Sequence, residues 1–285
     1  MPPASGRVVF TASMLPARLA TAAVAIPLLL WLIFGAPFVI YRGVVLLFTL
    51  VALVEYFHMA FPTRSALQRL GIVSGALVAL AMAGDPTESA VGMAAGLMAV
   101  VTFGLLSCLI GAKDPAGAVN DLGHMVLGVL YAGAFLPHFI WLRVNPDSSG
   151  PSWVTFVLAV ALGGDSGGYF AGRFFGKHLL MPAVSPKKTI EGSIGGVAGN
   201  LVGGAIVRVV LLPTVPWREI IVLSIVAGLL AQLGDLCESL LKRAFGAKDS
   251  GWLLPGHGGV LDRVDSLVFP VVLVYYYVNV LRVAG

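Results

Sequence analysis

Residues Val44–Phe61 read VVLLFTLVALVEYFHMAF, an apolar run that contains one acidic residue, Glu55. A helix needs about 20 mostly apolar residues to cross the hydrocarbon core of a bilayer, and this run has that character. Eight further runs resemble it, so the chain is predicted to be an all-α, polytopic integral membrane helical bundle with about nine transmembrane helices. The other runs are roughly Leu19–Phe34, Leu70–Ala83, Ala90–Ile110, Leu122–Leu142, Trp153–Phe170, Ile194–Leu212, Ile220–Leu236 and Ser266–Leu281.

The overall composition supports the same fold class. The 285 residues are 58% hydrophobic and 11% charged, and the mean hydropathy is +0.93. Soluble domains have about 45–50% apolar and about 25% charged residues, so an ordinary soluble domain is excluded. Cys108 and Cys237 show neither metal-ligand spacing nor a disulfide framework. We expect one membrane domain over residues 1–285, with N-terminal helices in 1–150 and catalytic helices and loops in 151–285.

The distribution of Lys and Arg predicts the orientation in the membrane. With nine spans, five of the 18 basic residues fall on one side, and the other 13 fall on the side of the N-terminus. Loops rich in Lys and Arg face the cytoplasm. The N-terminus and the two most charged loops, 171–193 and 237–265, are therefore expected to be cytoplasmic, in a bacterial-type inner membrane. The five are Arg42, Arg143, Arg208, Arg218 and Arg282.

The later charged loop follows an unusual helix end. Asp235, Glu238, Ser239 and Lys242 are spaced i, i+3, i+4 and i+7, so they share one helix face. Carboxylates are the hard oxygen ligands that Mg²⁺ prefers, and a lysine neutralises phosphate. Such a stripe could also be a solvated helix exit. Two more acids, Asp262 and Asp265, open the last span, and Asp262 could meet Asp235 across the two helices.

The earlier charged loop repeats this chemistry. Asp165 lies near the end of a span among several glycines, and Arg173 follows it. The run Ser185-Pro186-Lys187-Lys188-Thr189 then offers two adjacent cations and two hydroxyls. Taken alone, the two lysines are more typical of an anchor on the cytoplasmic side. No nucleotide-binding glycine motif of the P-loop or dinucleotide kind is present in either loop.

Glycines recur at intervals of four in the run that begins at Gly192. The pairs 192/196, 195/199 and 199/203 form a ridge on one face of the expected helix. Small residues at this spacing let two helix backbones approach closely in lipid. The ridge therefore predicts tight packing inside the bundle.

The longest motif resembles a known family. Its fixed positions match the signature of the CTP:phosphatidate cytidylyltransferases, also called CDP-diacylglycerol synthases, without a departure. The upstream residues around Asp165, Arg173 and Ser185–Gly192 are also similar to that family, whereas residues before 150 share mostly hydropathy. The motif is Ser239-x2-Lys242-Arg243-x4-Lys248-Asp249-x-Gly251-x2-Leu254-Pro255-x-His257-Gly258-Gly259-x2-Asp262-Arg263-x-Asp265.

The resemblance implies a membrane enzyme of phospholipid synthesis. CTP and phosphatidate would be its substrates, CDP-diacylglycerol and diphosphate its products, and Mg²⁺ its cofactor, with room for a second metal ion. It also implies a homodimer in a lipid bilayer. No nucleic-acid partner is expected, because nothing in the sequence suggests a basic arm that binds nucleic acid. The chemistry is consistent with the residues, because metal and Lys or Arg charge are needed to bring two anionic substrates together.

Hypotheses for individual roles follow from the resemblance and the residue chemistry. Asp235 and Asp262 are the expected metal ligands, with Glu238, Asp265 and Asp249 as further ligands. Lys242, Lys248, Arg263 and Arg243 are expected to hold phosphates, although Lys242 and Arg243 could anchor lipid head groups, and Asp249 could pair with Lys248. His257 would bond phosphate or hold its glycine turn. The remaining expected substrate-binding residues are Lys187, Lys188, Ser185, Thr189, Ser239, Asp165 and Arg173.

Other interpretations remain at this point. A buried acid in a span usually has a partner, so Glu55 would form a polar tie between helices or line a lipid cleft. A CDP-alcohol phosphatidyltransferase is disfavoured because its Asp-Gly…Ala-Arg…Gly…Asp…Asp pattern is missing. An ion or solute transporter would pair acids near the middle of its spans, whereas these acids gather near span ends. A paralogue that binds lipid without turnover is disfavoured by the intact acidic set.

Overall fold

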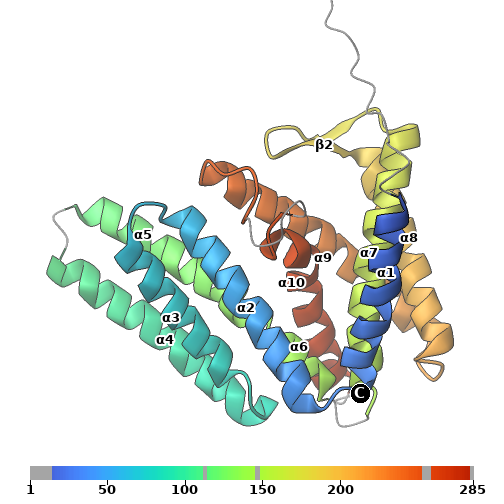
Figure 1. The fold of residues 1–285 in the computed structure, drawn as a ribbon, viewed down its shortest axis with the longest axis horizontal. Coiled ribbons are helices and arrows are strands. Elements are labelled where there is room, and N and C mark those ends of the chain that lie inside the picture. Colours follow the sequence, from blue (N-terminus) through green and yellow to red (C-terminus); the bar gives the residue numbers. More distant parts are fainter. Residues whose placement is uncertain (1–14, 112–113, 145–147, 252–257, 283–285) are drawn as a thin grey trace, which may run out of the picture.

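The computed structural model describes residues 15–111, 114–144, 148–251 and 258–282. Ten α-helices, three π-helical segments and one hairpin make up the described part of the chain (Figure 1). In chain order they are α1 (Leu15–Leu30), η2 (Trp31–Gly35), α2 (Phe38–Ala60), α3 (Ser65–Ala81), α4 (Pro86–Gly111), α5 (Pro115–Gly128), η3 (Val129–Ala134), α6 (His138–Arg143), α7 (Gly150–Phe175), β1 (Leu179–Met181), β2 (Ser185–Thr189), α8 (Ile190–Val210), α9 (Trp217–Ala244), α10 (Leu261–Tyr276) and η4 (Tyr277–Leu281).

Each of the nine predicted apolar runs lies in a helical segment. Seven described segments are long and apolar enough to cross a membrane, and two shorter ones, Ala23–Gly35 and Ser65–Ala81, are apolar as well. One predicted span, 122–142, consists of α5, η3 and α6 in succession, within the continuous segment Pro115–Arg143. The prediction of a polytopic helical bundle is confirmed.

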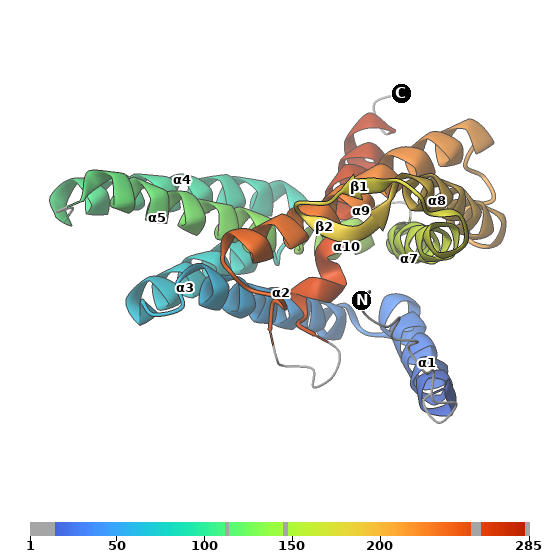
Figure 2. The same ribbon diagram turned by 90° about the horizontal axis from the view of Figure 1, so that it is seen from above.

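The helices form two groups that meet around α10. Helices α2 to α5 lie on one side, and α7, α8 and α9 lie on the other (Figures 1 and 2). Helix α10 packs against α9, α7, α6 and α2, so it contacts both groups. Fully buried aromatic side chains fill the interior, among them Tyr56, Trp141 and Trp153. The many exposed apolar side chains on the outside are expected for a protein whose solvent is lipid.

The glycine ridge does what its spacing predicts. Helices α7 and α8 pack backbone to backbone, and a methyl group on Gly199 would lie 2.0 Å from the carbonyl oxygen of Gly163. A methyl group on Gly167 would lie 2.3 Å from the carbonyl oxygen of Gly195. No side chain fits at this contact, so tight packing within the bundle is confirmed.

Within the described residues, the hairpin is the one departure from the all-helical expectation. Strands β1 and β2 pair antiparallel, with Leu179 opposite Thr189 and Met181 opposite Ser185, inside a segment that was expected to be only a loop. Two strands this short carry no readable alternation of apolar and polar residues, and an isolated hairpin is at best marginally stable. Tertiary contacts hold it: Glu191 Oε2 accepts hydrogen bonds from the backbone N–H groups of Lys177 at 3.0 Å and His178 at 3.2 Å.

Candidate active site

A cavity of about 430 Å³ lies between α7, β2, α8 and α9, and we call it the hairpin cavity. It forms where the hairpin folds over the ends of these helices, because Thr189 ends β2 and immediately caps α8. The Thr189 hydroxyl oxygen accepts a hydrogen bond from the backbone N–H of Gly192 at 3.1 Å, as a helix N-cap does. Six of the predicted site residues line the cavity, namely Asp165, Arg173, Lys187, Lys188, Thr189 and Asp235.

One ion pair crosses the hairpin cavity. Lys188 Nζ lies 2.6 Å from Asp235 Oδ2, and the two side chains are 29% and 33% exposed. Asp165 and Asp265 lie close enough to Lys188 and Asp235 for their charges to act on one another. Three carboxylates thus share one half-buried lysine, which leaves excess negative charge beside Lys187 and Arg173.

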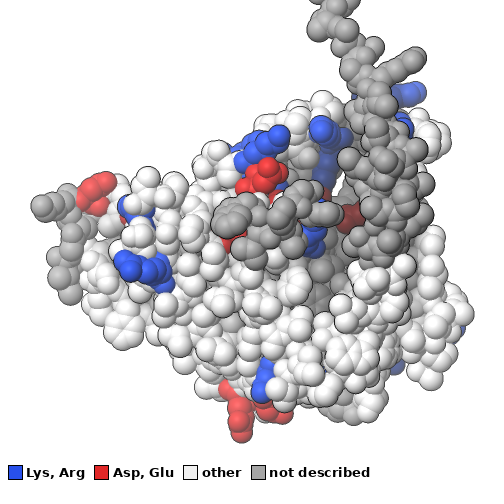
Figure 3. All heavy atoms as spheres, viewed as in Figure 1, with Lys and Arg blue, Asp and Glu red and all other residues white. Residues whose placement is uncertain are grey.

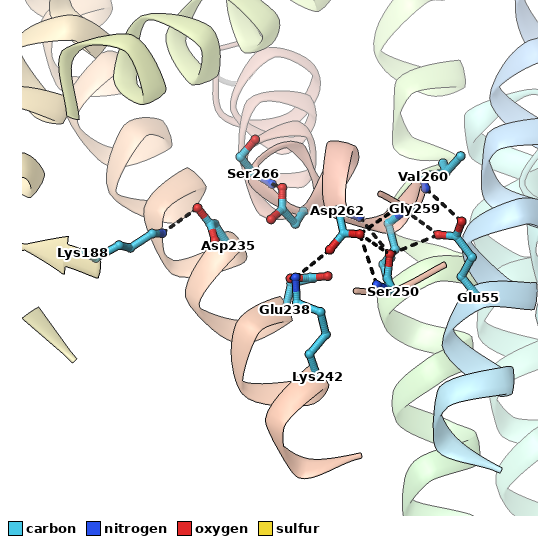
Figure 4. Close-up of polar contacts among 12 residues, drawn as sticks. Glu55, Lys188, Asp235, Glu238, Lys242, Ser250, Gly259, Val260, Asp262 and Ser266 are labelled. Atoms are coloured by element: carbon cyan, nitrogen blue, oxygen red, sulfur yellow. Dashed lines mark hydrogen bonds and ion pairs between the residues drawn. The ribbon is translucent and has the colours of Figure 1, made fainter. Parts of the chain in front are cut away.

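A second group of charges lies further along α9, and we call Glu238, Lys242 and Asp262 the Lys242 cluster (Figure 4). Lys242 Nζ lies 2.5 Å from Glu238 Oε2 and 2.6 Å from Asp262 Oδ1. Glu238 is 1% exposed, and its Oε1 accepts no hydrogen bond from the described residues. A buried acid is costly without a cation, so Lys242 compensates two acids from two helices.

The other oxygen of Asp262 is held by the segment before α10. Asp262 Oδ2 accepts hydrogen bonds from the Ser250 hydroxyl at 2.8 Å, the Ser250 N–H at 3.1 Å and the Gly259 N–H at 2.8 Å. Gly258 has a φ of +76°, a backbone conformation that side-chain-bearing residues rarely adopt. Both carboxylate oxygens of Asp262 are therefore fixed by donors of the protein.

Glu55 reaches this region from α2. It is 5% exposed, and it accepts hydrogen bonds from the backbone N–H groups of Val260 at 2.9 Å and Leu261 at 2.8 Å, at the start of α10 (Figure 4). Its Oε2 lies 3.4 Å from the Ser250 hydroxyl. Of the two interpretations of Glu55, the tie between helices is confirmed, and it joins α2 to α10.

The donor chemistry suits a magnesium ion, although the part of the chain that the structure describes forms no preassembled metal cage. Within the described residues, no three His, Cys, Asp or Glu side chains are grouped so that they could hold a metal ion. Mg²⁺ is usually bound by one or two carboxylates together with substrate phosphates and water, so such a cage is not required. The carboxylates in the hairpin cavity and the buried Glu238 supply suitable oxygens. Asp235 and Asp262, the expected pair of ligands, are engaged with different lysines.

The structure distributes the remaining predicted residues as follows. Ser185 begins β2, Ser239 and Arg243 lie in the last turns of α9, and Arg263 is exposed on α10. Lys248 and Asp249 are exposed beyond α9, and His257 lies outside the described residues.

Sequence reasoning gave no role to three polar residues at the site, Ser250, Gln232 and Glu191. Gln232 lines the hairpin cavity, and its Nε2 donates to the Ser193 carbonyl oxygen at 3.2 Å. Gln232 precedes Asp235 by three residues on the same helix face, a spacing that was available in the sequence. Ser250 and Glu191 offered no such signal, because only the fold brings their partners near. Those partners are the carboxylates of Asp262 and Glu55 for Ser250, and the backbone N–H groups of Lys177 and His178 for Glu191.

A group of charged side chains lies at one end of the molecule, and further charged groups lie at the left and at the bottom of the same face (Figure 3). In the view of Figure 3, blue and red atoms cluster near the top, where Figure 1 places the hairpin and the end of α9. The middle of this face is almost free of charge, as a surface in contact with lipid tails must be. The hairpin cavity and the Lys242 cluster therefore lie toward one end of the spans.

Comparison with known proteins gives the family. The model of the cytidylyltransferase family matches residues 16–281. A phosphatidate cytidylyltransferase of Bacillus subtilis is 39% identical over 157 residues, which is 55% of this chain and 58% of the relative. Relatives with the same name from Brucella suis and Staphylococcus saprophyticus are 43% identical over 155 residues and 36% identical over 169 residues. These alignments cover 54% and 59% of this chain.

The alignments span between 57% and 63% of the Brucella suis and Staphylococcus saprophyticus relatives, so each covers under two thirds of the relative's length. The family match, in contrast, extends from α1 to η4 and takes in both groups of helices. The chain belongs to the cytidylyltransferase family.

Proposed function

We propose that the protein transfers the cytidylyl group of CTP to phosphatidate, giving CDP-diacylglycerol and diphosphate. One observation carries the proposal: the hairpin cavity places Arg173, Lys187 and Lys188 opposite carboxylates, at the charged end of a membrane bundle. Cations hold the phosphates of both substrates, and carboxylates recruit a metal ion. The relatives that carry the name phosphatidate cytidylyltransferase support this choice of substrates.

The proposed reaction needs positioning and charge more than it needs a strong base. The phosphate of phosphatidate is already an anion, and one of its oxygens attacks the α-phosphorus of CTP. The bond between that phosphorus and the oxygen bridging to the β-phosphate breaks, and diphosphate leaves with the bonding electron pair. Lysine and arginine side chains lower the repulsion between the two anionic substrates and orient them for in-line attack.

Mg²⁺ is part of the proposal as the cofactor. The residues proposed to hold it are Asp235, which lines the hairpin cavity, and Asp265, whose charge acts on Asp235, with Asp262, Glu238 and Asp249 nearby along the chain. When bound, the ion would offset phosphate charge and polarise the phosphorus under attack. Lys188 and Lys242 now compensate these carboxylates, and they would be free to contact phosphate once a divalent ion takes that role.

The proposed setting is the cytoplasmic face of a bacterial inner membrane. A site near the ends of the spans lets acyl chains stay in lipid while the head group meets aqueous CTP. The excess of Lys and Arg on the side of loops 171–193 and 237–265 supports the orientation, with the N-terminus on the same side. A homodimer remains part of the proposal, as the resemblance implies.

The test is transfer of label by the purified full-length chain in phosphatidate-containing vesicles. With CTP labelled at the α-phosphate and Mg²⁺ present, label should enter the lipid phase, and diphosphate should appear in equal amount. Omitting phosphatidate should abolish both signals. Binding of CTP without transfer would indicate a lipid-binding paralogue and refute the proposal. Release of CMP from added CDP-diacylglycerol and an alcohol would point instead to a CDP-alcohol phosphatidyltransferase.

A further inference from the structure

The strongest unassigned feature is a buried acid that belongs to the other group of helices. Glu55 lies on α2, about 200 positions before the motif in the chain, yet its carboxylate receives two backbone N–H groups at the start of α10. The sequence separation is 205 residues to Val260 and 206 residues to Leu261. A carboxylate at a helix N-terminus satisfies donors that have no partner within the helix, and the helix dipole favours its charge.

The same carboxylate also fixes both sides of the segment before α10. A methyl group on Gly251 would lie 2.4 Å from Glu55 Oε1, and one on Gly259 would lie 2.6 Å from Glu55 Oε2. The backbone at both glycines therefore packs directly on the Glu55 side chain, and neither position has room for a larger residue. The Ser250 hydroxyl donates its hydrogen to Asp262 Oδ2 at 2.8 Å and lies 3.4 Å from Glu55 Oε2, so Ser250 stands between the two carboxylates.

These contacts form a continuous chain from α2 to the Lys242 cluster. Glu55 holds the first N–H groups of α10, and Ser250 and Gly259 hold Asp262 Oδ2. Asp262 Oδ1 is thereby left to face Lys242 on α9. Figure 4 shows this order, with Glu55 at one end, Asp262 in the middle and Lys242 at the other.

We propose that Glu55 is a positioning residue of the active site: it fixes the start of α10 and the Ser250 hydroxyl, and so sets the direction of the Asp262 carboxylate toward Lys242. The expected effect of Glu55 on turnover rests on the proposed cytidylyl transfer. The structural link, by which Glu55 fixes the start of α10 and the direction of Asp262, does not depend on that function. Glu55 does not line the hairpin cavity. It acts through Asp262, and substrate binding should depend on it much less than turnover does.

The test compares Glu55→Gln with Thr49→Val in the full-length protein in phosphatidate-containing vesicles. Gln has nearly the same shape as Glu, but its NH₂ group cannot accept the second backbone N–H. Thr49 is a matched control: it is also a buried polar residue on α2, and its hydroxyl donates to the Val45 carbonyl oxygen in its own helix. Glu55→Gln should lower kcat roughly 10-fold to 100-fold, as loss of a group supporting a reactive carboxylate does, with KM for both substrates little changed.

A second measurement does not require activity. Amide hydrogen exchange over residues 258–264 should be faster in Glu55→Gln by roughly tenfold, the effect of one lost charge-assisted hydrogen bond. Thr49→Val should leave it unchanged, and Glu55→Asp, which keeps the charge on a shorter side chain, should fall between Gln and the unchanged protein. If the unmodified protein transferred no label but this exchange pattern held, the proposed function would fail and the structural link would stand.

Two results would overturn the proposal. One is a kcat for Glu55→Gln equal to that of Thr49→Val, and the other is unchanged exchange at the start of α10. If Glu55→Gln failed to fold, Ser250→Ala would replace it, because it removes the hydroxyl link to Asp262 and leaves the contacts of Glu55 with α10 intact. A kcat for Ser250→Ala equal to that of the unmodified protein would then refute the link.

Discussion

Lys188 on β2 lies with its Nζ 2.6 Å from Asp235 Oδ2 on α9, so one ion pair joins the hairpin to the helix that carries the acidic stripe. Both side chains line the hairpin cavity and stay about one-third exposed. An ion pair that is partly exposed to solvent adds little stability by itself. Its position is informative for function, because little free energy is lost when the pair separates. An arriving phosphate can then pair with Lys188, and an arriving metal ion can pair with Asp235.

Replacing Lys188 with Ala should weaken the binding of the substrate whose phosphate it contacts. We expect KM for CTP or for phosphatidate to rise about tenfold, because a hydrogen bond to a charged group contributes about 1.5–3 kcal/mol and Lys188 is partly screened by solvent. Separate Michaelis constants for the two substrates identify which one it holds. Arg69→Ala, an exposed cation on α3, is the control. Unchanged constants for both substrates would contradict a role for Lys188 in binding.

Replacing Asp262 with Asn should stop turnover while the protein remains folded and inserted in the membrane. The Asn amide has one acceptor oxygen, so it cannot accept from Lys242 on one side and from Ser250 and Gly259 on the other. The substitution also removes the charge proposed to bind metal. We expect kcat to fall by about 100-fold or more, as for an electrostatic group at a reacting centre. Size-exclusion profiles and melting temperatures report the fold.

The matched control for Asp262→Asn is Asp121→Asn. Asp121 also forms an ion pair, with the exposed Arg64, and it lies on α5, on the α2–α5 side of the molecule. Near-normal kcat in Asp262→Asn, at a normal level of folded protein, would remove Asp262 from the site.

Replacing Gly199 with Ala should destabilise the bundle. The added methyl group would sit 2.0 Å from the Gly163 carbonyl oxygen, so α7 and α8 must separate. Overpacking of this kind costs about 1–3 kcal/mol, which should appear as a lower melting temperature in detergent. Gly43→Ala on α2 is the control, since nothing lies within 4 Å of its added carbon. Equal melting temperatures for the two variants would show that the contact between α7 and α8 is not tight in the membrane protein.

Removal of divalent ions should abolish label transfer, and Mg²⁺ should restore it. Ca²⁺ should restore it poorly, because Ca²⁺ prefers six to eight oxygen ligands at longer distances than the near-octahedral set that Mg²⁺ prefers. A readout independent of activity is the melting temperature with CTP, which should rise only when Mg²⁺ is present, by the usual linkage of binding to stability. Full label transfer in excess chelator would refute the requirement for a metal.

Much of the fold follows from the sequence because one requirement dominates it, namely that a helix inside a bilayer must present apolar side chains to lipid. A helix across a bilayer must be apolar over most of its length, so Val44–Phe61 and the eight similar runs could be identified without knowledge of their neighbours. The glycine ridge from Gly192 onward was equally readable, since its spacing of four is set by the helix itself. The hairpin was missed because its strands are short and its order comes from Glu191 and the adjoining helices.

The candidate site shows the same division. The spacing of Asp235, Glu238 and Lys242 placed them on one face of α9, and the ion pair between Glu238 and Lys242 follows from that spacing. The sequence does not show which cation on another element each of these acids contacts. The sequence allowed Asp235 and Asp262 to meet each other across two helices. Each is found on a different lysine, because packing of β2 and α10 against α9 decides those contacts.

The sequence by itself determined that this is a helical membrane protein and indicated which residues carry its chemistry, because hydropathy and residue type are local properties. The tertiary structure alone decided how Lys188 reaches Asp235 and how Glu55, about 200 residues earlier, holds the start of α10. Those contacts depend on how helices far apart in the chain pack against one another. A local pattern of neighbouring residues does not specify that packing.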